Sequence, residues 1–263
     1  MLYIIGIGPG NTEHLSLKAH DTLKSVHTVV GYTQYIEHIA HLIQGKEIIS
    51  TPMQKEVNRV QTAIEIARSG KSCALVSSGD SGIYAMAGLV FEFCQANHIP
   101  IIGKRSELSP TNQQSPLKVE VIPGIPALCA GASLLGAPLT HDFASISLST
   151  LLTPWEVIEK RIHAAASADF VIVFYNPKSQ KRDWQLDQAR EILLQYRNES
   201  TPVGIVRHAM REHESVQLVT LTTLHTAEID MNSVVFIGNS TTTVYQGYMI
   251  TPRGYSTKYT FGV

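Results

Sequence analysis

The chain has 263 residues, enough for one large domain or two modest ones, and its 44% hydrophobic and 16% charged residues predict a folded protein rather than a disordered one. A formal net charge of −1 excludes a nucleic-acid footprint spread over the whole surface. The three cysteines lack CxxC spacing, which suits a reducing cytoplasm. The start of the chain has no signal-peptide pattern, and no run approaches the ~20 apolar residues that span a bilayer. We therefore expect a soluble cytoplasmic protein.

Strand and helix patterns alternate through the first half of the chain. Short apolar runs predict buried strands at residues 2–7, 27–30, 48–49, 72–77 and 119–122. Helical spacing of apolar residues predicts helices at 15–26, 36–43, 57–67 and 83–96. This alternation predicts a mostly parallel sheet with helices on both faces.

The second half is organised differently. Residues 104–116 are rich in Ser, Pro, Asn and Gln and predict an exposed loop. Pro123-Gly124 then opens a helix rich in small residues, and we place a boundary there between an N-terminal α/β domain, 1–122, and a C-terminal α/β domain, 123–263. For the second domain we expect a mixed sheet, with strands at 145–148, 170–175, 203–206, 216–221 and 234–237.

One helix of the second half has a clear start signal. Thr153 is the expected N-cap, Pro154 takes the first helical position and Glu156 follows three residues after the cap. We therefore predict a helix that begins at Pro154.

A glycine-rich loop, Gly6-Ile7-Gly8-Pro9-Gly10, follows the first predicted strand, where a dinucleotide fingerprint would lie. Asn11 stands where the third glycine belongs, Pro9 has no amide donor and no acidic residue ends the second strand. A P-loop is excluded as well, because no Gly-Lys-Ser/Thr follows. A tight turn with a purely structural role is the alternative to a binding loop.

Two polar loops also follow predicted strands. Ser77–Gly82 lies at the carboxyl end of a parallel strand, the edge where open α/β sheets bind ligands, and a plain turn with Asp80 as N-cap is the alternative. Arg207–Glu212 gathers several charges, and a solvated loop is the alternative there. His38 and His41 lie one helical turn apart without a third ligand, so no metal site is expected.

Taken together, these segments resemble the S-adenosylmethionine-dependent methyltransferases that act on tetrapyrroles, and most of all the C17-methylating branch of cobalamin biosynthesis. Besides the glycine loop and Pro123-Gly124, the resemblance is carried by SSGDSGIYAMAG (77–88), GASLLGAPLTHDFASISLSTLLTPWEVIEKR (131–161), VFYNPKSQKR (173–182), GIVRHAMRE (204–212) and MITPRGY (249–255). The 131–161 block is highly specific. Ser81 and Pro126 depart from the family pattern, which usually has Pro and a small hydroxyl residue at these positions.

The resemblance implies two α/β domains of the tetrapyrrole methylase type, with the active site in the cleft between them, and a homodimer. It implies methylation of C17 of precorrin-3B, or of cobalt-factor III, with ring contraction to precorrin-4 or cobalt-precorrin-4. The alternatives are a sister enzyme acting at another ring carbon such as C11, and a non-catalytic tetrapyrrole-binding homologue. The electron-rich ring carbon is itself the nucleophile, so no protein nucleophile is expected.

The resemblance also implies roles for individual residues. Binding of S-adenosylmethionine, with S-adenosylhomocysteine as product, is expected at Ser78, Gly79, Asp80, Ile83, Pro126, Ala127, Tyr175, Arg207, His208 and Ala209. Substrate binding, chiefly of the macrocycle's carboxylates, is expected at Gly8, Pro9, Gly10, Arg161, Lys178, Lys181, Arg182, Arg211 and Arg253.

A general base is expected to accept the proton of the C20 hydroxyl during ring contraction. The candidates are His208, Asp80 and Asp142. An imidazole titrates near neutrality, which suits this task, and we expect the flanking Arg207 and Arg211 to favour the neutral form of the His208 ring.

Overall fold

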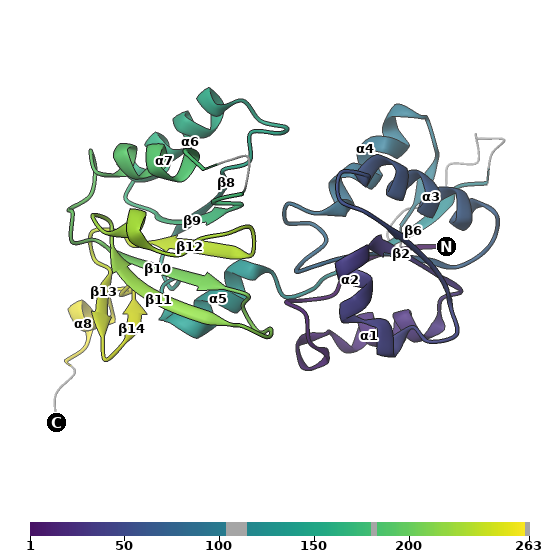
Figure 1. Ribbon diagram of the computed structural model, residues 1–263, viewed down its shortest axis with the longest axis horizontal. Helices are drawn as coiled ribbons and strands as arrows, with labels where there is room; N and C mark the ends of the chain where they lie inside the picture. Colours follow the sequence, from purple (N-terminus) through teal and green to yellow (C-terminus); the bar gives the residue numbers. More distant parts are fainter. Residues whose placement is uncertain (104–114, 180–182, 261–263) are drawn as a thin grey trace. The chain divides into compact units, whose positions relative to one another are not determined.

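The computed structural model describes residues 1–103, 115–179 and 183–260 (Figure 1). The chain forms two compact units, unit 1 (Met1–Ala127) and unit 2 (Leu128–Val263). Most of the loop predicted at 104–116 lies outside the described residues, as do Lys181 and Arg182. None of the helices in the described ranges is long and apolar enough to cross a membrane.

Unit 1 alternates strands and helices along the chain. Its elements are β1 (Leu2–Gly6), η1 (Thr12–His14), α1 (Leu17–Ser25), β2 (Thr28–Tyr32), α2 (Thr33–His38), η2 (Ala40–Leu42), β3 (Glu47–Thr51), α3 (Glu56–Arg68), β4 (Cys73–Ser77), α4 (Met86–Ala96), β5 (Ile101–Ile102) and β6 (Leu117–Ile122). The strands form one parallel sheet in the order β3-β2-β4-β1-β6-β5. The predicted parallel sheet is confirmed.

Two helical layers cover this sheet. Ile4 and Leu75 pack with α3 and α4 in one core, whereas Ile5 and Val76 pack with α1 and α2 in the other. The layers lie above and below the strands in Figure 1. Because neighbouring residues of a strand face opposite layers, both must be apolar, which explains the continuous apolar runs in the sequence. Each of these fully buried side chains contributes about 1.5–3 kcal/mol.

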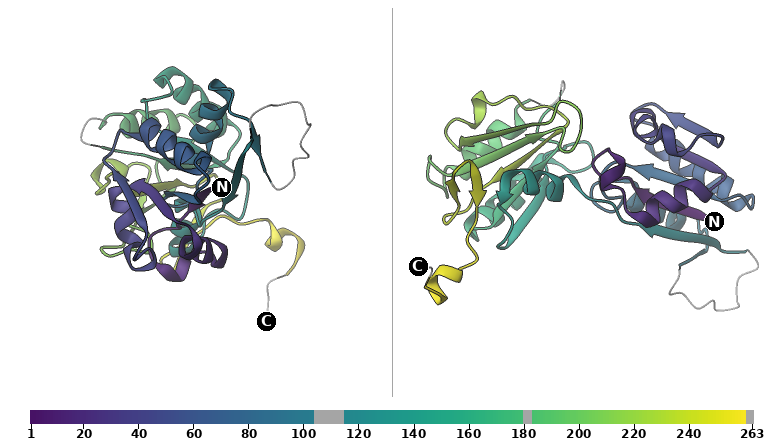
Figure 2. Two further views of the ribbon diagram at one scale, coloured as in Figure 1. Left: turned by 90° about the vertical axis from the view of Figure 1, so that its right-hand side faces the viewer. Right: turned by 90° about the horizontal axis from the view of Figure 1, so that it is seen from below.

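Unit 2 holds a mixed sheet, as predicted. Its elements are α5 (Ala127–Leu135), β7 (Gly136–Ala137), β8 (Phe143–Ser147), α6 (Trp155–Ser167), β9 (Val171–Tyr175), α7 (Gln185–Leu193), β10 (Pro202–Arg207), β11 (Ser215–Thr220), η3 (Leu224–Thr226), β12 (Ser233–Ile237), β13 (Thr243–Tyr245), β14 (Tyr248–Ile250) and α8 (Tyr255–Lys258). The main sheet has the order β11-β10-β12-β9-β8, and a small sheet has the order β13-β14-β7. Figure 2 shows α8, in yellow, beyond the small sheet.

Strand directions in unit 2 fix which loops share an edge. β8 and β9 are parallel, and β12 is antiparallel to both β9 and β10, so β8, β9 and β10 run in one direction. We call the edge where these three strands end the carboxyl edge, and the opposite one the amino edge. Helices α6 and α7 pack on one face of the sheet, whereas α5 packs on the other, where Gly131 leaves room for Phe236 (Figure 1).

Two details differ from the sequence predictions. Helix α6 begins at Trp155, and Pro154 is its N-cap, with an extended backbone and a carbonyl that accepts hydrogen bonds from Val157 and Ile158. Thr153 therefore lies outside the helix, one residue before the cap. The short strands β5, β7, β13 and β14 were not predicted, because two or three residues carry too little periodicity to be recognised.

Candidate functional site

Three loops of unit 1 meet in what we call the glycine junction, formed by Gly6, Gly79 and Gly124. A Cβ atom on Gly6 would lie 2.7 Å from the Gly124 nitrogen and 2.7 Å from the Gly79 oxygen. One on Gly124 would lie 2.2 Å from the same Gly79 oxygen. Only residues without a Cβ permit this approach. The junction thus joins the loops that follow β1, β4 and β6, which the sequence analysis had singled out separately.

Backbone hydrogen bonds hold the first two loops together. The Gly8 amide donates to the Gly79 oxygen at 3.0 Å, and the Gly79 amide donates to the Gly8 oxygen at 2.8 Å. The Ile7 amide donates to the Ser77 oxygen at 2.9 Å. Both Gly8 and Gly79 have a positive φ, +69° and +67°. Because these amides are engaged and Pro9 has none, the loop is unsuited to cradle a phosphate.

Asp80 ties the third loop to the other two. Its Oδ2 accepts a hydrogen bond from the Gly124 amide at 3.0 Å, and its Oδ1 accepts one from the Gly82 amide at 2.8 Å. The alternative of Asp80 as a helix N-cap is wrong, since α4 begins at Met86 and Ala85 occupies the cap position. The carboxylate is therefore a clamp between two loops.

Two hydroxyl groups near the junction are buried without a hydrogen-bond partner among the described residues. Ser77, at the end of β4, is 2% exposed and Ser81 is 0% exposed, and each has an unpartnered Oγ. Buried hydroxyls are normally hydrogen-bonded, and leaving one unpaired costs about 1–3 kcal/mol. A ligand with polar atoms at this turn would satisfy them. This fits the expected S-adenosylmethionine, whose ribose and amino-acid groups carry such atoms.

The other cofactor residues expected in unit 1 lie in the same neighbourhood. The Ile83 amide donates to the Asp80 oxygen at 3.4 Å. A Cβ on Gly79 would lie 3.6 Å from the Pro126 Cα and 3.8 Å from the Ala127 nitrogen, and Ser78 precedes this glycine. The structure therefore brings together all the predicted cofactor residues of unit 1, half-buried around the junction.

The cofactor residues expected in unit 2 lie at the carboxyl edge. Tyr175 ends β9 and Arg207 ends β10, with His208 and Ala209 following. The Tyr175 hydroxyl accepts a hydrogen bond from the Leu128 amide at 2.9 Å, at the first turn of α5. His208 has a left-handed backbone (φ +49°), and its amide donates to the Asn232 oxygen at 3.1 Å.

Arg207 is held by two acidic residues that the sequence analysis did not identify. Its Nη1 lies 2.7 Å from Glu228 Oε2, and its Nη2 lies 3.1 Å from Asp230 Oδ2. The hydrogen bond to Asp230 raises the pKa of the Arg207 guanidinium. Asp230 Oδ2 also lies 3.8 Å from His208 Nε2.

This arrangement bears on the expectation that Arg207 acts on the His208 ring. The charge of Arg207 is compensated by Glu228 and Asp230, and the acidic group beside the His208 ring is Asp230. The expectation for the ring thus relied on a cation that is already paired with two carboxylates. The Asp-x-Asn-Ser sequence at 230–233 is typical of a turn, but nothing in it indicates that the turn meets β10.

The remaining predicted site residues are dispersed. Asp142 precedes β8 and therefore lies at the amino edge of the sheet, opposite His208. Arg253 lies on the Asp142 side and donates from Nη1 to the Thr140 oxygen at 3.3 Å. Lys178 is exposed and follows β9, at the carboxyl edge. Arg211 lies in the turn after His208, where its amide donates to the His208 oxygen at 2.9 Å.

Arg161 is exposed on α6. In the glycine-rich loop of unit 1, Gly8 and Pro9 are buried and Gly10 is half-buried, with a φ of +143°. The predicted Lys181 and Arg182 lie outside the described residues. Within the described ranges, no three His, Cys, Asp or Glu side chains lie together as a metal ion would require.

Comparison with known proteins identifies close relatives. The pattern that defines the tetrapyrrole (corrin/porphyrin) methylases matches residues 1–225. The chain is 48% identical over 259 residues to the cobalt-factor III methyltransferase of Priestia megaterium, covering 98% of this chain but 46% of that protein. It is 46% identical over 256 residues to the probable cobalt-factor III C(17)-methyltransferase of Salmonella typhimurium, covering 97% of this chain and 100% of that protein. A crystal structure of the methyltransferase CobJ superposes with a TM-score of 0.82 at 32% identity, covering 95% of this chain and 99% of CobJ.

Proposed function

The chain belongs to the tetrapyrrole methylases, and from this we propose that it methylates C17 of cobalt-factor III or precorrin-3B, with ring contraction, in cobalamin biosynthesis. The observation that carries the proposal is the 46% identity to the probable C(17)-methyltransferase of Salmonella typhimurium, which extends over that protein's full length. The products are cobalt-precorrin-4 or precorrin-4. We place the enzyme in the cytoplasm and expect it to act as a homodimer.

When bound, S-adenosylmethionine supplies an electrophilic methyl group on a sulfonium. In unit 1 the residues that would hold it are those around the glycine junction: Ser78, Gly79, Asp80, Ile83, Pro126 and Ala127. In unit 2 they are Tyr175 and the backbone of Arg207, His208 and Ala209. The unpartnered hydroxyls of Ser77 and Ser81 support this assignment, because they offer polar groups for a ligand.

The work of the protein in methyl transfer is alignment. The ring carbon is the nucleophile, and holding two reactants in line supplies up to about 7–11 kcal/mol. The glycine junction and the Asp80 clamp fix the backbone that would hold one of the two reactants. We therefore give Asp80 a positioning role in this proposal.

His208 is our candidate for the general base that accepts the C20 hydroxyl proton. It follows β10 at the carboxyl edge, whereas Asp142 lies at the opposite edge and both oxygens of Asp80 already accept backbone hydrogen bonds. His208→Asn retains hydrogen bonding but does not titrate, so we expect slower single-turnover ring contraction with a changed pH profile. An unchanged rate and profile at intact cofactor affinity would remove His208 from this role.

Carboxylate binding is proposed for two cations that follow the same strands as the candidate cofactor residues of unit 2. These are Lys178 and Arg211, with Arg161 farther along α6 and the backbone of Gly8 to Gly10 against the macrocycle. Lys181 and Arg182 stay in the proposal on sequence grounds alone. Arg253 lies at the amino edge, away from the other cations, in the wall of a separate cavity.

Product analysis tests the proposed function. The protein is incubated with a carbon-labelled methyl donor and with either precorrin-3B or cobalt-factor III, and the product is identified by mass and ¹³C NMR. The expected product carries the label at C17 on a contracted ring. Label at C11 would identify a sister enzyme, and substrate binding without label transfer would identify a non-catalytic homologue.

A further inference from the structure

A cavity of about 300 Å³ opens at the amino edge of the unit 2 sheet. Its walls include His141, Asp142, Phe170, Asn239 and Arg253. β9 begins at this edge, one residue after Phe170, whereas Tyr175 and His208 lie at the other end of the strands. The cavity is therefore separate from the unit 2 residues proposed above for cofactor binding.

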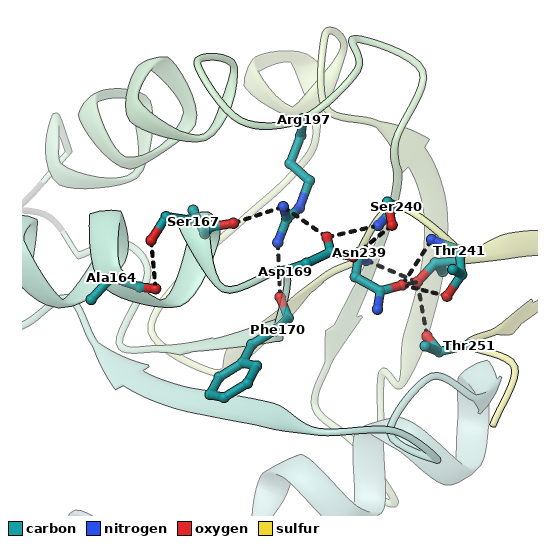
Figure 3. A network of polar contacts seen from close by, with 11 residues as sticks. Ala164, Ser167, Asp169, Phe170, Arg197, Asn239, Ser240, Thr241 and Thr251 are labelled. Atoms are coloured by element: carbon teal, nitrogen blue, oxygen red, sulfur yellow. Dashed lines mark hydrogen bonds and ion pairs between the residues drawn. The ribbon is translucent and has the colours of Figure 1, made fainter. Parts of the chain in front are cut away.

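Asn239, which lines this cavity, has a side-chain donor without a partner among the described residues. Its Oδ1 accepts hydrogen bonds from the Thr241 amide at 3.1 Å, the Thr241 hydroxyl at 2.9 Å and the Thr242 hydroxyl at 3.0 Å. The backbone donor fixes which end of the amide is oxygen. Figure 3 shows these bonds converging on the oxygen, and no described residue bonds to Nδ2. The residue is 7% exposed and lines the cavity.

Asp169, the acidic group deeper in the wall, already has partners for both oxygens. Its Oδ1 lies 2.9 Å from Arg197 Nη1 and accepts the Ser240 amide at 3.0 Å, and its Oδ2 accepts the Ser240 hydroxyl at 2.5 Å (Figure 3). Arg197 is a buried cation behind it and compensates its charge. Asp169 therefore neither attracts a cation strongly nor competes for the free donors.

Two further side chains in the wall offer donors. The Nδ1 atom of His141 accepts the Asp142 amide at 2.8 Å and lies 3.6 Å from Asp142 Oδ2, so Nε2 is the ring nitrogen that is left to donate to a ligand. Arg253 uses Nη1 for the Thr140 oxygen and has four more N–H groups on its planar fork. The opposing charge is Asp142, whose side chain is 74% exposed and therefore screened by water.

We propose that this cavity binds a carboxylate on a short aliphatic stem. Apart from the exposed carboxylate of Asp142, the side-chain groups described above that have spare hydrogen-bonding capacity are donors, so the ligand must supply acceptor oxygens. A planar carboxylate matches the guanidinium of Arg253, with a second contact at Asn239 Nδ2. Ala168, Phe170 and Pro252 give the stem an apolar wall. Two sources share this chemistry: a free small carboxylate, and an acetate or propionate side chain of a tetrapyrrole.

The test is an NMR titration of the ¹⁵N-labelled full chain with propionate, acetate, inorganic phosphate and chloride, followed at the backbone amides of Asp169 and Thr241. Propionate should give saturable shifts, at an affinity at least tenfold higher than phosphate or chloride. Equal response to all anions would mean non-specific ion binding and would overturn the proposal, as would the absence of saturation.

Two variants test whether Asn239 and Arg253 bind the carboxylate. Asn239→Asp retains the acceptor oxygen for Thr241 and Thr242 but replaces the free donor by a negative oxygen, and Arg253→Gln removes the guanidinium. Each should weaken propionate binding at least tenfold with thermal melting near that of the wild type. Lys160→Gln, an exposed charge loss on α6, is the matched control and should bind as the wild type does. Unweakened binding in both cavity variants would contradict the assignment.

A tetracarboxylate porphyrin distinguishes the two sources. If it shifts the same two amides more strongly than propionate at equal carboxylate concentration, and Arg253→Gln abolishes this, the ligand is a macrocycle side chain. If propionate alone acts on them, the ligand is a free carboxylate. Neither outcome depends on methyl transfer, so failure here is distinct from failure of the proposed function.

Discussion

The carboxylate of Asp80 shows how a polar residue in a motif can act through the backbone. A negative charge that accepts two amide hydrogen bonds is held in one orientation, and each such bond is stronger than a neutral one. The same two bonds connect the turn after β4 to the loop after β6. We infer that Asp80 sets the shape of the glycine junction instead of exchanging a proton.

We predict that Asp80→Asn weakens cofactor binding about tenfold, because one of the two amides then faces an NH₂ group, at a cost of about 1–3 kcal/mol. Isothermal titration with S-adenosylhomocysteine measures this. Asp21→Asn, an exposed substitution on α1, is the control and should bind normally. If Asp80→Asn binds the cofactor normally but fails in ring contraction, Asp80 is a base and not a clamp.

Asp230 has the second informative carboxylate. Burial alone would raise its pKa, but hydrogen bonds from the Ser233 hydroxyl, the Asn232 amide and Arg207 outweigh burial and lower the pKa. The folded state therefore favours the ionised form. The resulting stability is present above the unfolded pKa of about 3.9 and is lost as the pH falls through the lower folded value.

Asp230→Asn should thus reduce the free energy of unfolding at pH 7 by about 1 kcal/mol or less, since the side chain is partly exposed and screened. The difference from the wild type should shrink as the pH is lowered from 6 to 3. Urea denaturation across this range measures it. Glu228→Gln removes the more exposed partner of Arg207 and should have a smaller effect. A difference independent of pH would refute the linkage.

At the scale of elements, the site depends on how closely three loops approach. The strands β1, β4 and β6 are neighbours in the parallel sheet, with β1 in the middle, so the loops at their carboxyl ends converge. Gly6, Gly79 and Gly124 stand where these loops cross. The packing of backbone on backbone leaves no side chain that could move aside.

Gly124→Ala should therefore destabilise unit 1 by about 2 kcal/mol or more, because its Cβ would meet a backbone oxygen at 2.2 Å. Gly88→Ala is the matched control: Gly88 lies on α4 with nothing within 4 Å of the added Cβ. That change should be neutral or stabilise by up to about 1 kcal/mol. Thermal unfolding measures the stability of both variants. Equal melting temperatures would contradict the close approach of the Gly124 backbone to the Gly79 oxygen.

These elements also show what the sequence can and cannot predict. β1, β2, β4 and the helices α1, α3 and α4 were predicted because buried strands and amphipathic helices have distinct apolar periods. The helix predicted at 36–43 is instead the end of α2 followed by the 3-10 helix η2. The turns at Gly6 and Gly79 were predicted because polar or glycine-rich residues follow a buried strand. The pairing of Arg207 with Asp230 could not be predicted, since it depends on β12 lying beside β10, and sheet order leaves no local pattern.

The residues that meet at the amino edge could not be predicted from the sequence either. Asp142 was named with His208 as a candidate base, and the sequence did not show that the two residues lie at opposite edges of the sheet. A residue that precedes β8, β9 or β10 lies at the amino edge, and one that follows these strands lies at the carboxyl edge. Asp142 precedes β8 whereas His208 follows β10, so the two residues lie at opposite edges. Arg253 comes from a segment without a predicted element, so nothing placed it before the structure was known.

For the whole molecule, the net charge of −1 gives no general attraction for an anionic macrocycle. Affinity for a substrate with several carboxylates must then come from a few local cations. Lys178 is exposed after β9, and Arg211 lies in the turn after β10. Attraction between exposed charges weakens as salt shortens the screening distance, from about 30 Å at 0.01 M to about 3 Å at 1 M.

Substrate affinity should therefore fall about tenfold between 0.05 and 0.5 M NaCl, whereas affinity for S-adenosylhomocysteine, a zwitterion, should change less than about twofold. Replacing both Lys178 and Arg211 by Gln should weaken substrate binding at low salt and flatten its salt dependence, because the charges that salt would screen are then gone. Lys160→Gln loses a charge on α6 and should retain the wild-type slope. Fluorescence titration at several salt concentrations measures the affinity for the macrocycle of the wild type, the double variant and Lys160→Gln. If the double variant keeps the full slope, the carboxylates are bound by other cations, and the assignment of Lys178 and Arg211 fails.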